Sequence, residues 1–165
     1  MGRKPIMNID EVEYHDWGDG GKFQARLGPL ALKMGARKLG YRMVILPPGK
    51  TGWPYHFHHV NEEMFFVLEG EGTLRYADQD YPVRPGDVIC CPPGSETPHQ
   101  LTNTSEQELK YLAVSTMEAP EVAEYPDSGK FGVICGSAPG SDPGQQTFRI
   151  FASKSSGVDY WEGES

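Results

Sequence analysis

Three histidines and three glutamates, two of them adjacent, lie within one short run, WPYHFHHVNEEMFFVLEG, which spans residues 53–70 of a chain that contains only five histidines in all. On a β-strand, side chains two residues apart share a face, so His56 and His58 point together and His59 points away. Two imidazoles at this spacing can bind one metal ion. Glu63 stands at the start of the apolar segment that follows, and it joins the two histidines if its face is the interior of the fold.

A further ligand must come from a distant part of the chain. His99, the last histidine, follows the Pro- and Gly-rich segment CCPPGSETP. An HxH pair alone is often only a polar surface feature, but a glutamate at fixed spacing and a remote histidine make a metal site the better interpretation. Glu62 points away from Glu63 on a strand, which favours a rim position. The alternative role for Glu62 is that of a general base or an alternate ligand, and it is the candidate catalytic residue.

The elements that must position these residues are predicted to be strands. Gly and Pro are abundant (20 and 14 residues) and spread without a period, and helix signals are few. Apolar segments of five to eight residues alternate with turn residues and indicate an antiparallel sandwich or barrel. These segments are LGYRMVILPPG, EMFFVLEG, GTLRYADQD, DYPVRPGDVICCPPG and HQLTNTSEQELKYLAVSTM.

The segment EMFFVLEG is apolar on both faces, so something must cover its outer face: an arm of the chain or a second subunit. This pattern predicts a homodimer. Beyond Met117 the sequence is rich in Pro, Gly and Ser, which predicts an irregular arm. We therefore expect a single domain over residues 1–165, with a barrel core at about 35–118, an irregular N-terminal arm at 1–34 and an irregular C-terminal arm at 119–165.

Two stretches resemble the two motifs of the cupin superfamily. The first motif contains HxH, a glutamate and a glycine, and His56, His58, Glu63 and Gly70 match it, although its leading glycine is out of register. The second motif is matched by Gly86, Pro92, Gly94, His99 and Asn103, with a two-residue insertion before His99 that preserves strand parity. The resemblance implies a double-stranded β-helix, which is a jelly-roll-like antiparallel barrel. It also implies that His56, His58, Glu63 and His99 are ligands of one divalent transition metal.

Bulk properties exclude several classes of function. A net charge of −8 without a basic block argues against nucleic acid or an anionic membrane as a partner. No apolar stretch is long enough to span a membrane, and no secretory signal is visible. Three cysteines, two of them adjacent, do not suggest a disulfide framework. We expect a cytoplasmic protein that acts on a small molecule.

Three imidazoles and one carboxylate suit Mn, Fe, Zn or Ni, and they leave a coordination position open. One hypothesis is a Lewis-acid enzyme, because several small cupins resemble sugar-phosphate isomerases; Arg42, Lys50 and Arg75 are weak candidates for a phosphate clamp. A second hypothesis is an Fe-dependent dioxygenase with an aromatic mouth formed by Trp53, Tyr55 and Phe57. A third is a non-catalytic module that binds a small ligand.

Overall fold

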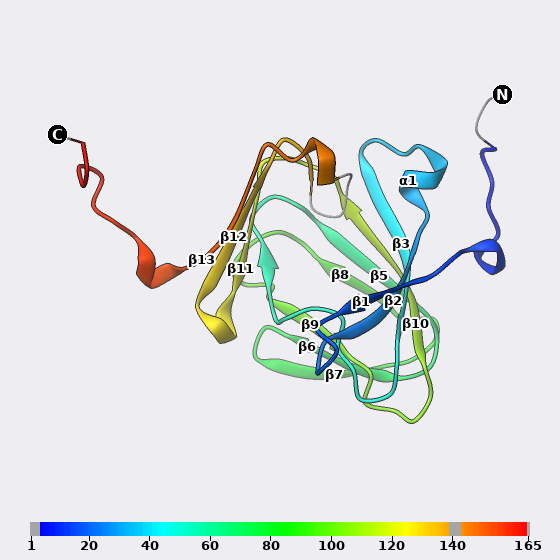
Figure 1. Cartoon of the computed structure of the whole chain (residues 1–165). Helices are drawn as coiled ribbons and strands as arrows, with labels where there is room; N and C mark the ends of the chain where they lie inside the picture. The colour runs from blue at the N-terminus through cyan, green and yellow to red at the C-terminus, as the bar shows by residue number, and fades with distance from the viewer. Residues whose placement is uncertain (1–3, 139–142, 165) are drawn as a thin grey trace.

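The computed structural model describes residues 4–138 and 143–164, and its regular secondary structure is mostly antiparallel strands (Figure 1). The strands are β1 (His15–Gly18), β2 (Gln24–Pro29), β3 (Leu39–Leu46), β4 (Phe57–His58), β5 (Glu63–Glu69), β6 (Gly72–Tyr76), β7 (Gln79–Val83), β8 (Val88–Cys91), β9 (His99–Thr102), β10 (Leu109–Thr116), β11 (Glu121–Tyr125), β12 (Lys130–Cys135) and β13 (Phe148–Ser153). The helices are α1 (Ala31–Met34) and the 3-10 turns Ile9–Glu11, Pro126–Ser128, Pro143–Gln145 and Lys154–Ser156.

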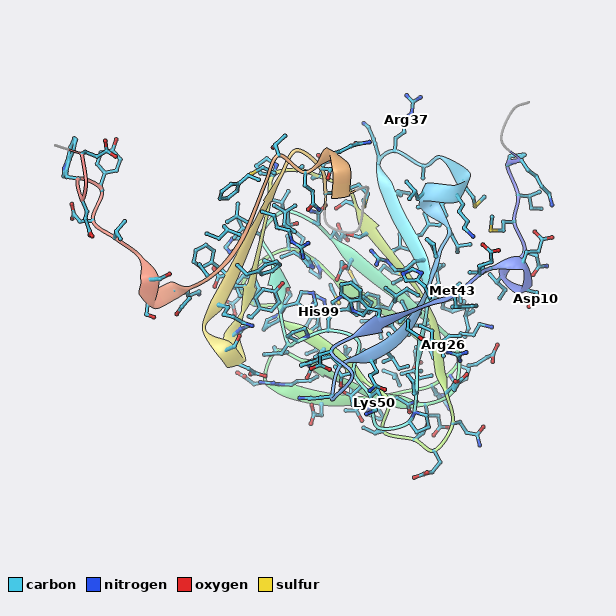
Figure 2. The ribbon with its side chains drawn as sticks, in the orientation of Figure 1. Asp10, Arg26, Arg37, Met43, Lys50 and His99 are labelled. Atoms are coloured by element: carbon cyan, nitrogen blue, oxygen red, sulfur yellow. The ribbon has the colours of Figure 1, made fainter. Side chains whose placement is uncertain are left out.

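The strands form three sheets. The largest has the order β1-β2-β3-β10-β5-β8, and a second contains β7-β6-β9. These two sheets enclose the main core, which is built from the inward residues of alternating strands such as Val44, Val67, Leu101 and Tyr111. In Figure 2 His99 lies within the body of the molecule, where the sheets meet. The predicted all-β, jelly-roll-like barrel is confirmed.

The outer face of the largest sheet is covered by the N-terminal part of the chain. Val12 and Leu30 are buried there against Met43 of β3, and Leu68 of β5 packs against the same cluster. The doubly apolar character of β5 is therefore explained at least in part by an arm of the chain itself. This arm is also more ordered than predicted, because it contributes β1 and β2 to the sheet edge.

The C-terminal segment differs most from the prediction. Instead of an irregular arm, residues 121–153 hold three strands that pair with β4 in the order β13-β12-β11-β4. Most of the Pro, Gly and Ser residues lie outside these strands, whereas the strands themselves (EVAEY, KFGVIC and FRIFAS) are rich in β-branched and aromatic residues. Beyond β13 the chain leaves the body of the molecule (Figure 1) with Tyr160 and Trp161 exposed. None of the described helices is long and apolar enough to cross a membrane.

Candidate metal centre

Backbone pairing brings the two distant histidine segments together. The amide of His99 donates to the carbonyl of His56 (2.8 Å), and the amide of His56 donates back to His99 (3.2 Å). The Pro-Gly turn that precedes β9 is fixed to the same place, because the Gly94 amide donates to the carbonyl of His58 (2.8 Å). The insertion before His99 thus does not turn this side chain away, and only 2% of it is exposed.

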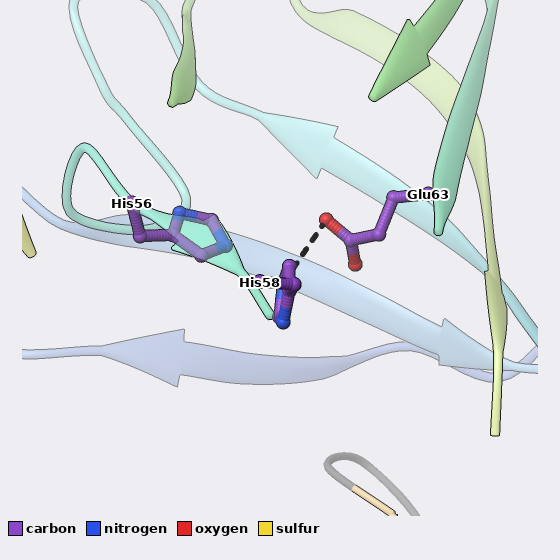
Figure 3. Close-up of side chains that lie close together, drawn as sticks. All are labelled: His56, His58 and Glu63. Carbon is purple, nitrogen blue, oxygen red and sulfur yellow. Dashed lines mark ion pairs between the residues drawn. The ribbon is translucent and has the colours of Figure 1, made fainter. Parts of the chain in front are cut away.

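The side chains of His56, His58 and Glu63 converge in the interior (Figure 3). One donor atom from each lies within 4.8 Å of the other two, a spacing that a single ion can bridge. His99 borders this group: its Nε2 lies 3.1 Å from Glu63 Oε2, and its ring centroid lies 4.7 Å from that of His56. The structure therefore gathers the four predicted ligands, three of them within one cluster and the fourth against its carboxylate.

The outer nitrogens of all three rings face acceptors. His56 Nδ1 lies 2.8 Å from the carbonyl of Pro54, and His99 Nδ1 lies 3.0 Å from the carbonyl of Thr97. A carbonyl can only accept, so each of these Nδ1 atoms carries the proton in a neutral ring and Nε2 keeps its lone pair. His58 Nδ1 lies 3.5 Å from Glu121 Oε2. The same arrangement orients metal-binding histidines in proteins generally.

Burial and the neighbouring side chains shift the pKa values of the whole cluster. Burial and the neighbouring histidines lower the pKa of His56 to about 3. Burial also acts to lower the pKa of His58 and His99, but Glu121 and Glu63 around His58, and Cys91 and Glu63 around His99, raise both pKa values to about 10. Burial acts to raise the pKa of Glu63, yet the histidines hold it well below the ordinary value. Near neutral pH His58 and His99 are therefore protonated when no cation is bound, and each must lose a proton before its Nε2 can bind one.

The residues fit a divalent metal. Both ring nitrogens of His58 are buried, and neither makes a hydrogen bond with the described part of the chain. A buried nitrogen without a partner is costly, and a cation facing Nε2 would remove that cost. Nitrogen and oxygen donors in this combination suit Mn, Fe, Ni or Zn.

Sequence reasoning missed the carboxylate that supports the site. Glu121 on β11 is 1% exposed and lies beside His58. It accepts hydrogen bonds from the amide (2.9 Å) and the side chain of Asn61, and from the amides of His59 (3.2 Å) and Val60 (3.3 Å). Glu121 therefore holds the turn that joins the two ligand-bearing strands. The alternation in EVAEY was a signal that could have placed Glu121 on a strand.

Other predicted residues lie outside the cluster. His59 points away and contacts Glu124 on the outer side (2.9 Å). Glu62 is exposed, and the Cys90 thiol donates to its carboxylate at 3.9 Å. Tyr55 and Phe57 are buried, so they do not form the expected aromatic mouth, whereas Trp53 is partly buried and packs against the main core. Arg75, weighed as a phosphate contact, is paired with Asp127 (2.7 Å).

The barrel that holds this cluster is similar to known proteins. Residues 42–115 match the Cupin domain family. An oxalate-binding protein of Thermotoga maritima is 32% identical over 97 residues, which cover 58% of this chain and 78% of that protein. The chain belongs to the cupin superfamily. The predicted resemblance is thereby confirmed.

Two further similarities extend the comparison. An uncharacterized protein of Methanocaldococcus jannaschii is 37% identical over 60 residues; the match spans 36% of this cupin and only 46% of that relative's length. A solved structure from Acidithiobacillus ferrooxidans, provisionally named a sugar phosphate isomerase, superposes with a TM-score of 0.79 at 23% identity. It covers 95% of this chain and 97% of its own, so the shared fold extends beyond the barrel.

Proposed function

We propose that this cupin is a metal-dependent enzyme that interconverts an aldose phosphate and a ketose phosphate. The observation that supports it most directly is the group His56, His58, Glu63 and His99, in which each histidine has its outer nitrogen facing an acceptor and the Glu63 carboxylate lies against His58 and His99. A divalent ion held there would act as a Lewis acid toward adjacent substrate oxygens. The similarity to the Acidithiobacillus protein along nearly the whole chain agrees with this proposal at the level of the fold.

The reaction itself requires proton transfer and no redox partner. Interconversion moves one proton between two adjacent carbons and one between their oxygens, so atoms and electrons balance within the substrate. Tyr125 lies beside His56, and the centroids of the two stacked rings are 6.0 Å apart. Burial raises the pKa of the Tyr125 phenol, so it is a neutral hydrogen-bond donor near pH 7. We assign Tyr125 to substrate orientation. Glu62, the candidate for proton transfer from the sequence, is exposed and lies outside the cluster, so we do not assign it that role.

The proposal is tested by solvent exchange. Metal-loaded protein is incubated with hexose and pentose phosphates in D₂O, and deuterium at carbon 1 or 2 is measured by NMR. We expect incorporation with the unaltered protein and with His59→Ala, whose side chain faces away from the cluster. We expect none with His99→Ala. Absence of deuterium in every sugar phosphate, with metal bound, would refute the isomerase assignment.

A second candidate is a non-catalytic module that binds a small dicarboxylate. The observation that favours it is the 32% identity to a protein named for oxalate binding. A buried ion with an open position would accept a chelating carboxylate as readily as two sugar oxygens. Oxalate binding measured by calorimetry, together with no deuterium incorporation, would support this function over the first.

We also propose that the protein is a homodimer. The N-terminal arm covers part of the outer sheet face, but Val88 on the edge strand β8 and Leu39 on β3 stay exposed. A second copy is the simplest cover for such apolar edges.

A further inference from the structure

The sheet that the C-terminal strands form turns one face toward the metal centre. Paired residues share a face, and the register pairs Tyr125 with Lys130, Gly132 with Phe151 and Ile134 with Arg149. Glu121 belongs to the same face, and its carboxylate lies beside His58. The face that carries Tyr125, Phe151 and Arg149 is therefore the face directed at the metal centre.

Aromatic rings extend from a ligand of the metal centre across this face. The Tyr125 ring is stacked on His56 with an interplanar angle of 21°, and the Phe151 ring centroid lies 6.1 Å from that of Tyr125. Gly132 on the intervening strand makes room for Phe151, because a Cβ at this position would come within 2.6 Å of its ring. The rings form a continuous wall from the interior to the rim.

A cation ends this wall. The guanidinium carbon of Arg149 lies 5.1 Å from the centroid of Phe151, and the positive charge of Arg149 acts to lower the pKa of Tyr125 against the effect of burial. Arg149 is exposed, and no carboxylate of the described residues pairs with it. By contrast, Arg75 and Lys154 are both neutralised, by Asp127 and Glu124. Arg149 is thus a cation held in place by a ring and available to an anion.

We propose that Arg149 binds the phosphate group of the substrate, with Phe151 as its platform and the Tyr125 hydroxyl as a second donor. Guanidinium groups bind phosphate through paired N–H donors, and contact with an aromatic face restricts the side chain beforehand. Lys130, whose Nζ lies 5.8 Å from the Tyr125 ring on the same face, adds positive charge. This inference rests on the proposed function in naming a sugar phosphate, but the anion site itself does not depend on catalysis.

The direct test uses inorganic phosphate as the probe. Its binding to zinc-loaded protein is measured by phosphorus NMR at fixed ionic strength, for the unaltered protein, Arg149→Gln and Lys22→Gln. Lys22 is the matched control, because its ammonium also lies over a ring, that of Phe23 (5.6 Å), but on the turn between β1 and β2. We expect Arg149→Gln to bind phosphate about tenfold more weakly or worse, Lys22→Gln to bind it unchanged, and Arg149→Lys to fall between.

No phosphate binding by the unaltered protein, or equal binding by Arg149→Gln, would overturn the proposal. Steady-state kinetics of the unaltered protein and of Arg149→Gln distinguish an error in the phosphate site from an error in the proposed isomerase function. If sugar phosphates are isomerised, Arg149→Gln should raise KM for the phosphate ester and change its kcat little. The KM for the corresponding unphosphorylated sugar should also change little. An unchanged KM would refute the role of Arg149 and leave the isomerase intact. Loss of phosphate binding in Arg149→Gln, without deuterium exchange in the unaltered protein, would leave the anion site and refute the isomerase.

Discussion

Replacement of Glu121 by Gln tests whether a residue that touches no substrate organises the metal centre. One carboxylate oxygen of Glu121 accepts from the amides of His59 and Val60, and the other accepts from the amide and the side chain of Asn61. Gln keeps one oxygen and sets an NH₂ group against the other pair of donors. Two hydrogen bonds to a buried charged acceptor are lost, at about 1.5 kcal/mol each, so we expect unfolding free energy to fall by about 3 kcal/mol.

The same change should weaken metal binding. Without the carboxylate, the outer nitrogen of His58 loses its charged partner Glu121, and loss of such a partner typically weakens metal affinity about 10- to 100-fold. Chemical denaturation of metal-free protein gives the stability, and competition with a chromophoric chelator gives the affinity. Glu124→Gln is the matched control: Glu124 lies on the same strand, but it pairs with His59 and Lys154 near the surface, where about 1 kcal/mol or less is expected.

Acid pH supplies an independent check. The contacts with His58 and Asn61 outweigh burial and hold the pKa of Glu121 below its ordinary value of 4.5. The carboxylate therefore contributes stability above that value and loses it as the pH falls through the folded-state pKa. In Glu121→Gln, the free energy of unfolding should therefore depend less on pH in this acid range. If metal affinity stays within about threefold of the unaltered protein while stability falls, Glu121 supports only the turn and the reasoning about His58 is wrong.

Four further predictions follow from the same geometry. His99→Ala should reduce the metal content measured by elemental analysis, whereas His59→Ala should retain it; equal contents would contradict the ligand assignment. Because the pKa values of His58 and His99 are about 10 in metal-free protein, metal must displace protons, so affinity should rise with pH. Titration calorimetry in buffers of different ionisation enthalpy should detect up to about two protons released near neutral pH, and zero would contradict the site electrostatics. Glu62→Gln should change kcat by less than about twofold, because Glu62 is exposed and outside the cluster; a loss of about 100-fold or more would restore it as the general base. Light scattering at micromolar concentration should give the mass of a dimer, and a monodisperse monomer would end that proposal.

The barrel and the ligand cluster could be anticipated because their signals are local. Strand parity alone separates His56 and His58 from His59, and alternating segments between Pro-Gly turns mark most strands of the barrel. The supporting shell could not be anticipated in the same way. Glu121 is one of many acidic residues in an acidic chain, and nothing near it in the sequence indicates that it meets His58.

The C-terminal sheet was missed for a different reason. Composition averaged over residues 119–165 is dominated by loop residues, which conceal three short strands whose partners lie far away in the sequence. For Tyr55 and Phe57, by contrast, the sequence suggested a functional role that the structure does not support. Their position beside the histidines suggested a mouth, but tertiary packing buries them, with the Tyr55 hydroxyl donating to the carbonyl of Ala77.

The pairing of Glu121 with the turn at Asn61 also sets an order of events during synthesis. All four candidate ligands have left the ribosome once His99 has emerged, but the carboxylate that orients His58 is made later in the chain. A nascent barrel can therefore fold around its histidines before it can hold a cation in the correct arrangement. Metal binding in the correct arrangement is therefore a late step that follows formation of the C-terminal sheet. A chain that ends before β11 would lack the carboxylate that orients His58.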